Sequence, residues 1–248
     1  MGVSFDTTSW STIVAVQGTD SAACRVALNR LCTTYWIPLY CYVRQKGHPP
    51  DEAQDLTQEF FCRMLERGTF GLVSPQRGRF RRFLMTLMDH FLTDTWRKEG
   101  ALKRGGGRLP VALDFTMAEG SYAWDHRPDA DPRTVYDCQW AQAVLDAAAA
   151  RLRQEYAASG RADLFERLKE RLVGRDGRVT HETLGAELGM TPGAVKAAVY
   201  RLRRRYAVCV HEEIAATLAD EAQVEEELRY LFSAVSTWQF GEPSSPTS

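Results

Sequence analysis

The chain has 248 residues, of which 44% are hydrophobic and 25% are charged, and its formal net charge is −1. This composition is typical of a globular protein with one large or two small domains, and it excludes a uniformly basic chain. Residues 1–11 contain no basic side chain and no apolar run of the length that a secretory signal needs. No apolar stretch is long enough to span a bilayer, so we expect a cytoplasmic protein.

The six cysteines are not spaced as metal ligands. No two of them stand at C-x-x-C spacing, and no histidine lies beside a pair. We therefore expect reduced, mostly buried thiols, no metal ion and no cofactor. The chain also lacks a nucleophile–base pair and a phosphate-binding loop, which favours a protein that is not an enzyme.

Helical periodicity dominates the N-terminal part of the chain, where strand signals are weak. One helix is expected over residues 27–43, and a second is expected after Asp51, which is placed to cap it. Residues 68–78 contain glycines that interrupt the pattern and are expected to form a loop. A third helix follows, with apolar residues at helical spacing: Phe80, Phe83, Leu84, Leu87, Met88, Phe91, Leu92 and Trp96.

These helices predict one small helical domain over residues 11–108, which ends in a glycine-rich segment. Residues 109–135 lack periodicity and are interpreted as a linker, and residues 136–210 form a second helical domain. An acidic helical extension, 211–248, follows and ends in a disordered tail. The predicted fold is therefore all-α, with two small helical domains joined by a linker.

Charge is sharply partitioned along the chain. Residues 77–108 carry nine Lys/Arg and three Asp/Glu, a net charge of +6, whereas residues 110–150 have a net charge of −5. Residues 192–210 have a net charge of +5, and residues 211–232 have a net charge of −6. One basic segment in each predicted domain indicates two contacts with a polyanion.

Residues 180–206 carry the most distinctive local motif, a predicted helix-turn-helix. Thr180 can cap the first helix, Gly189 stands where a sharp turn needs a left-handed residue, and Thr191 with Pro192 can begin the second helix. Gly185 stands where such units usually carry alanine. An ordinary helical hairpin with a solvated basic face is the alternative interpretation.

The second helix of this motif has two unlike sides. Val195, Val199, Leu202 and Tyr206 lie on one side. The opposite side is suited to a DNA major groove, because small residues permit close approach and long polar residues can contact bases or phosphates. With Thr191 at its start, it carries Gly193, Lys196, Ala197, Tyr200, Arg201 and Arg204.

The helix that follows Asp51 has an acidic face formed by Glu52, Asp55 and Glu59, with Gln58 beside them. Such a face can simply be solvated. However, the segment DEAQDLTQEFFCRML, then SPQRGRFRRFLMTLMDHFLTDTWRK, then a C-terminal helix-turn-helix resembles the sigma-70 family of bacterial RNA polymerase sigma factors. The resemblance is to the extracytoplasmic-function (ECF) group, and it covers about residues 20–108 and 136–210.

The resemblance implies a role for each segment. The acidic helix would bind the clamp helices of the largest polymerase subunit through Glu52, Asp55, Gln58 and Glu59. The loop 69–78 would hold a base flipped from the −10 element, and the duplex −35 element would be read by the outward side of residues 191–204. The melted −10 strand would be held by Arg77, Arg79, Arg82, His90, Arg97 and Lys98, with Trp96 serving as core or as a stacking surface.

The expected function is that of a sigma factor, which binds core RNA polymerase and directs promoter recognition, promoter melting and transcription initiation. A stand-alone helix-turn-helix repressor and a sigma-like signalling adaptor are the alternatives. Further expected partners are an anti-sigma factor or a protein kinase. The promoter sequence and the inducing signal are not encoded in any pattern of the chain.

The acidic extension permits two interpretations. It can be a solvated stabilising helix, with an apolar face that packs on a domain. Alternatively, it can fold over a basic DNA-binding face and compete with phosphate from within the same molecule.

Overall fold

The computed structural model describes residues 22–66, 80–98, 114–125, 127–172, 180–218 and 221–240. Within these residues the chain is all-helical and contains no strand, which confirms the predicted class. The helices are α2 (Ala22–Gln45), α3 (Pro50–Glu66), α4 (Phe80–Lys98), α5 (Phe115–Asp125), α6 (Pro132–Ala158), α7 (Ala162–Leu168), α8 (His181–Leu188), α9 (Pro192–Ala215) and α10 (Val224–Phe240), with 3₁₀ turns at Lys169–Arg171 and Glu221–Gln223. None of the described helices is both long enough and apolar enough to cross a membrane.

The chain divides into two compact units. Unit 1 consists of Met1–Ala143 and Ile214–Ser248, and unit 2 consists of Val144–Glu213. The divisions therefore fall inside α6 and inside α9, whereas the sequence suggested boundaries near residues 135 and 210. Each of these two long helices contributes residues to both units.

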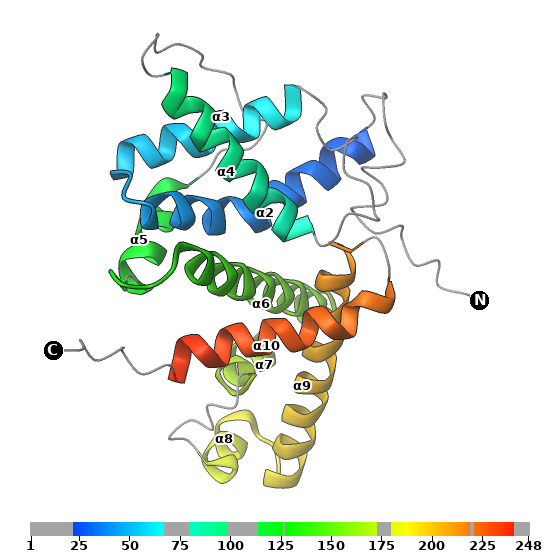
Figure 1. Ribbon diagram of the computed structural model, residues 1–248. Coiled ribbons are helices and arrows are strands. Elements are labelled where there is room, and N and C mark those ends of the chain that lie inside the picture. The colour runs from blue at the N-terminus through cyan, green and yellow to red at the C-terminus, as the bar shows by residue number, and fades with distance from the viewer. Residues whose placement is uncertain are drawn as a thin grey trace, which may run out of the picture. The chain divides into compact units, whose positions relative to one another are not determined.

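Helix α2 is the centre of unit 1 and contacts α3, α4 and α5 (Figure 1). Its side chains Tyr35, Leu39 and Tyr42 are buried. The Tyr35 ring meets the ring of Phe80 of α4 edge-on, with their centroids 5.1 Å apart. Burial of each such side chain contributes about 1.5–3 kcal/mol, and this aromatic core fixes α3 and α4 on α2.

Helix α3 begins two residues earlier than an N-cap at Asp51 requires. Its first residue is Pro50, so Asp51 lies inside the first turn rather than at the N-cap. Proline suits this position, because the first N–H groups of a helix have no intrahelical acceptor. In the first turn the carboxylates of Asp51 and Glu52 still interact favourably with the helix dipole.

Helix α5 lies within residues 109–135, where the sequence shows no helical periodicity. Phe115 is placed against two aromatic rings of α2, with centroid distances of 5.3 Å to Trp36 and 5.6 Å to Tyr40. Glu119 receives hydrogen bonds from Arg44 and from the Tyr40 hydroxyl, the latter at 2.6 Å. These contacts make α5 a packed part of unit 1.

The C-terminal segment also forms part of the core of unit 1. Its buried residues are shared between the end of α9, the turn that follows it and α10: Ile214, Thr217, Leu218, Val224, Glu227 and Leu231. Phe232, which the sequence places on the same apolar face, is 58% exposed. Residues 241–248, expected to be disordered, lie outside the described residues.

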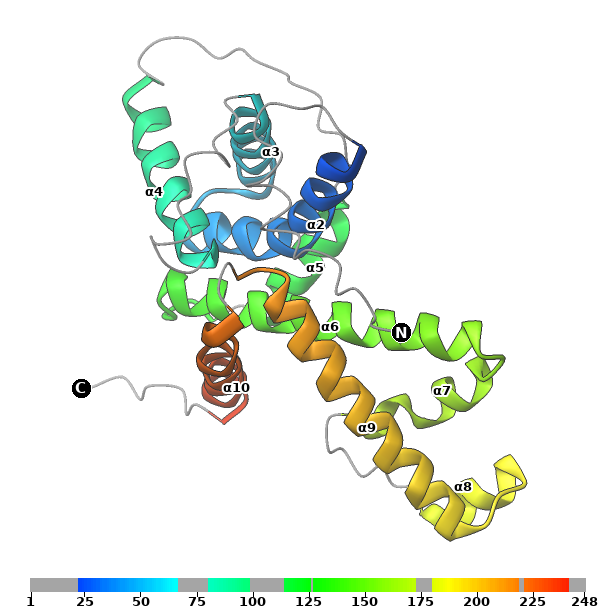
Figure 2. The same cartoon turned by 90° about the vertical axis from the view of Figure 1, so that its right-hand side faces the viewer.

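Unit 2 is built from the second part of α6, from α7, α8 and most of α9, whose arrangement can be followed in Figure 2. The Tyr206 hydroxyl of α9 donates to the backbone carbonyl of Leu145 at 3.0 Å, and burial raises the pKa of this tyrosine to about 12. The core contains Val144, Ala148, Leu152, Phe165, Leu168, Leu184, Val195, Val199 and Leu202.

Candidate nucleic-acid interface

Helices α8 and α9 are joined by a tight turn whose local geometry follows the sequence closely. The Thr180 side chain accepts a hydrogen bond from the backbone N–H of Thr183 at 3.2 Å, which caps α8. Gly189 ends α8 in the left-handed conformation, with φ 63°. The Thr191 side chain accepts a hydrogen bond from the backbone N–H of Ala194 at 3.2 Å, and Pro192 begins α9. The three predicted local signals are confirmed.

Gly185 of α8 is required by the close approach of this turn. Its carbonyl accepts a hydrogen bond from the Met190 N–H at 2.8 Å. A Cβ atom at position 185 would lie 2.6 Å from the Met190 carbonyl oxygen, which is closer than a methyl group tolerates. The structure therefore explains why glycine replaces the alanine that is usual at this place.

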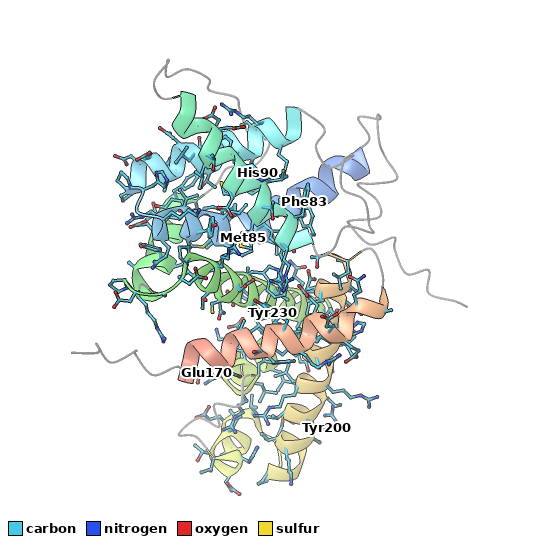
Figure 3. All side chains as sticks on the ribbon, viewed as in Figure 1. Phe83, Met85, His90, Glu170, Tyr200 and Tyr230 are labelled. Carbon is cyan, nitrogen blue, oxygen red and sulfur yellow. The ribbon has the colours of Figure 1, made fainter. Side chains whose placement is uncertain are left out.

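The two sides of α9 differ in burial as the sequence predicts. Val195, Val199 and Leu202 are buried, and Tyr206 is half-buried. On the other side Tyr200 is 66% exposed (Figure 3), and open space surrounds the Cα of Gly193. Four more of the residues predicted to contact duplex DNA are also exposed: Thr191, Lys196, Arg201 and Arg204. Ala197 is half-buried.

The arginines of the run Arg201–Arg205 fall into two classes. The Arg203 Nε donates to the backbone carbonyl of Arg171 at 2.7 Å, and Arg205 forms two hydrogen bonds with the carboxylate of Glu155. Arg201 and Arg204 form no hydrogen bond or ion pair with any residue that the structure describes. Their charges are consequently left to solvent or to an external anion.

Arg205 belongs to a charge network that fixes α9 against α6 inside unit 2. Its hydrogen bonds hold the pKa of the Glu155 carboxyl below its usual range. Arg151 of α6 pairs with Glu212 of α9 at 2.6 Å, and Arg205 lies 3.5 Å from the same carboxylate. Arg201 and Arg204 take no part in this network.

Two of the residues predicted to hold a melted strand lie on an exposed face of α4. Arg82 and His90 are exposed, and Figure 3 labels His90. Thr86 and Thr93 of the same face are exposed as well. This face presents the guanidinium of Arg82 and the imidazole of His90, while the Thr86 and Thr93 hydroxyls donate to backbone carbonyls of α4. It is suited to the backbone of a single strand.

The other predicted strand contacts are not part of the described structure. Arg77, Arg79 and the loop 69–78 lie outside the described residues. Arg97 and Lys98 occupy the last turn of α4, and their side chains, like that of Trp96, also lie outside the described part.

The acidic residues of α3 differ in how far they are already neutralised. Glu59 forms an ion pair with Arg63, and Glu52 lies 3.0 Å from the Nδ1 of His48. Asp55 is exposed and forms no ion pair with a described residue, while Gln58 is half-buried. Among the carboxylates predicted to bind the polymerase, Asp55 is therefore the most available to a basic partner.

Arg81 is a residue whose role the sequence analysis missed. It is 1% exposed, and its charge is held by Asp137 of α6 and Glu227 of α10. A signal for it exists in the sequence, because Arg81, Leu84 and Met88 share one helical stripe at i, i+3 and i+7. A charge inside an apolar stripe predicts a buried ion that needs carboxylate partners.

Among the side chains that the structure describes, nowhere do three His, Cys, Asp or Glu gather as ligands for a metal ion. Four cysteines within these residues are buried thiols that form no disulfide: Cys41, Cys62, Cys138 and Cys209. Comparison of the chain with protein-family models, with curated proteins and with solved structures gives no match.

Proposed function

We propose that this chain is a sigma factor of the sigma-70 family, in the ECF group, which binds core RNA polymerase and directs transcription initiation. The observation that carries the proposal is the outward face of α9. Helices α8 and α9 would act as a helix-turn-helix, in which Lys196, Tyr200, Arg201 and Arg204 are exposed and have no hydrogen-bond or ion-pair partner among the described residues. A major-groove contact needs side chains of this kind on one side of a capped helix.

The other two faces support the same proposal. Asp55 on α3 offers a carboxylate that forms no ion pair with a described residue, for docking on a basic surface of the polymerase. Arg82 and His90 on α4 offer a face for the melted −10 strand. The chain would supply binding energy for promoter recognition and melting, and the polymerase would supply nucleotidyl transfer.

Run-off transcription with purified core polymerase and a promoter library tests this function directly. We expect transcripts that start at defined positions downstream of a shared pair of sequence elements. A stand-alone repressor would instead bind palindromic duplex sites without polymerase. A signalling adaptor would bind core weakly and start no transcript, and either result would contradict the proposal.

A further inference from the structure

A buried arginine joins the C-terminal helix to α4. Arg81 lies in the first turn of α4, and its Nε donates to Oε1 of Glu227 in α10 at 2.5 Å. Its Nη1 donates to Oδ1 of Asp137 in α6, also at 2.5 Å. The exposed fractions of the Arg81 and Glu227 side chains are 1% and 2%. The contact therefore replaces water around both charges.

Aromatic side chains complete the surroundings of this arginine. The Arg81 guanidinium carbon lies 3.8 Å from the ring centroid of Tyr230 and 5.0 Å from that of Trp140. The Tyr230 hydroxyl donates to the second carboxylate oxygen of Asp137 at 2.5 Å, and Figure 3 shows Tyr230 on the side of α10 that faces α6. The Tyr136 hydroxyl donates to the Arg81 carbonyl at 3.0 Å. Five side chains of α6 and α10 therefore contact this one residue of α4.

The charge of Arg81 depends on these partners. Burial by itself lowers the pKa of Arg81, but the hydrogen bond and charge of Glu227 and the charge of Asp137 hold the pKa above its usual value. Loss of the Glu227 carboxylate would leave the buried guanidinium with Asp137 as its one described acidic partner and with a weaker hydrogen bond at Nε, which costs more than the loss of an exposed pair. The position of α4 in unit 1 is consequently coupled to the presence of α10.

The contact lies on the opposite side of α4 from its exposed face. Arg81 and Arg82 are consecutive, yet Arg81 is buried and Arg82 is exposed together with His90. Helix α10 thus holds α4 and leaves the face of Arg82 and His90 open. This arrangement favours a structural role of the C-terminal segment and gives no support to competition with DNA at α4.

We infer that α10 is a built-in brace for α4, in which Glu227 and Asp137 are positioning residues that orient the face of Arg82 and His90 toward a bound strand. The inference rests on the proposed function for what α4 binds. The C-terminal segment would then act on strand capture indirectly, because no residue of α10 has to contact DNA.

The test compares full-length Glu227→Gln with Glu225→Gln, a change of the same kind at an exposed position of the same helix. Each protein is assembled with core polymerase, and binding is measured to a forked probe that carries a single-stranded −10 element. We expect Glu227→Gln to weaken probe capture by about tenfold or more, the range of coupling between contacting residues, and Glu225→Gln to leave it unchanged. Co-purification with core, which depends on α3, should stay normal in both.

A second variant separates positioning from loss of folding. Arg81→Met combined with Glu227→Met replaces the buried ion pair by apolar side chains, which is often neutral for stability. We expect this double variant to recover probe capture, because α4 and α10 remain in apolar contact and Asp137, whose side chain is 14% exposed, keeps its hydrogen bond from the Tyr230 hydroxyl. Persistent loss in the folded double variant, unchanged or tighter capture by Glu227→Gln, or an equal loss of core binding and probe capture would each overturn the brace.

Hydrogen–deuterium exchange keeps this inference distinct from the proposed function. Glu227→Gln should speed amide exchange in α4 and leave α3 unchanged, whether or not the chain acts with a polymerase. If the wild-type chain starts no transcripts while α4 loosens in this way, the sigma assignment fails and the brace stands. If α4 exchange is unchanged, the brace fails irrespective of transcription.

Discussion

Arg201 and Arg203 stand two residues apart on α9 and have opposite surroundings. Arg203 donates from Nε to the backbone carbonyl of Arg171 at 2.7 Å, whereas Arg201 is exposed and forms no hydrogen bond with a described residue. Residues of one type in one short run thus serve two purposes. Arg203 fastens α9 to the rest of unit 2, and Arg201 is available to a ligand.

Substitution of the outward arginines should weaken DNA binding without loss of stability. We expect Arg201→Ala and Arg204→Ala each to cost about 1–3 kcal/mol of promoter binding if they contact bases in pairs of hydrogen bonds. If they contact only phosphates, affinity should fall evenly across sequences and the salt dependence should flatten. Arg203→Ala is the matched control, which should lower the unfolding temperature instead. Unchanged promoter binding by the double variant would show that this face is not the reader.

Charge reversal at Asp55 should prevent docking on core polymerase. Glu59 is already paired with Arg63, so Asp55→Arg by itself is a cleaner change than reversal of both carboxylates. A positive charge facing a basic surface should abolish co-purification with core, while circular dichroism stays native because Asp55 is exposed. Asp129→Arg, at an exposed turn residue, makes the same change of charge and should bind core normally. Normal core binding by folded Asp55→Arg would contradict the docking role.

Alanine at position 185 should destabilise unit 2. The new methyl group would lie 2.6 Å from the Met190 carbonyl oxygen, and relief of such a contact costs about 1–3 kcal/mol, more than the helix propensity of alanine returns. Gly193→Ala is the control, because a Cβ atom there meets nothing within 4 Å. Thermal unfolding should show a lower midpoint for Gly185→Ala and an equal or higher midpoint for Gly193→Ala. Equal midpoints for Gly185→Ala and the wild type would refute the close approach.

The Glu155–Arg205 contact should make stability sensitive to acid. Because the folded-state pKa of Glu155 is lowered by Arg205, its contribution is present above the unfolded-state pKa and is lost as the pH falls through the folded-state value. We expect Glu155→Gln to lower the unfolding midpoint at pH 7 and to lose less stability than the wild type as the pH falls below about 4, the ordinary range of glutamate. Glu170→Gln, at an exposed position, should match the wild type at each pH. Parallel pH profiles for Glu155→Gln and the wild type would exclude this coupling.

The sequence by itself determined the features that depend on neighbours along the chain. The caps at Thr180 and Thr191 and the left-handed turn at Gly189 follow from interactions that close within three or four residues. The buried and exposed sides of α9 follow from helical periodicity for the same reason. The candidate face of α9 was therefore predictable residue by residue.

Only the tertiary structure decided the features that depend on residues far apart in the chain. Arg81 is buried and Arg82 is exposed because Arg81 forms an ion pair with Glu227, which lies 146 positions away in the chain. No local sequence pattern indicates such a partner. Helix α5 has no amphipathic signal, yet Phe115 packs between Trp36 and Tyr40. The acidic extension looked like a solvated helix or a competitor for DNA, because residues 211–232 carry seven Asp/Glu and one arginine. Burial of one of those charges against a distant arginine made α10 part of the core.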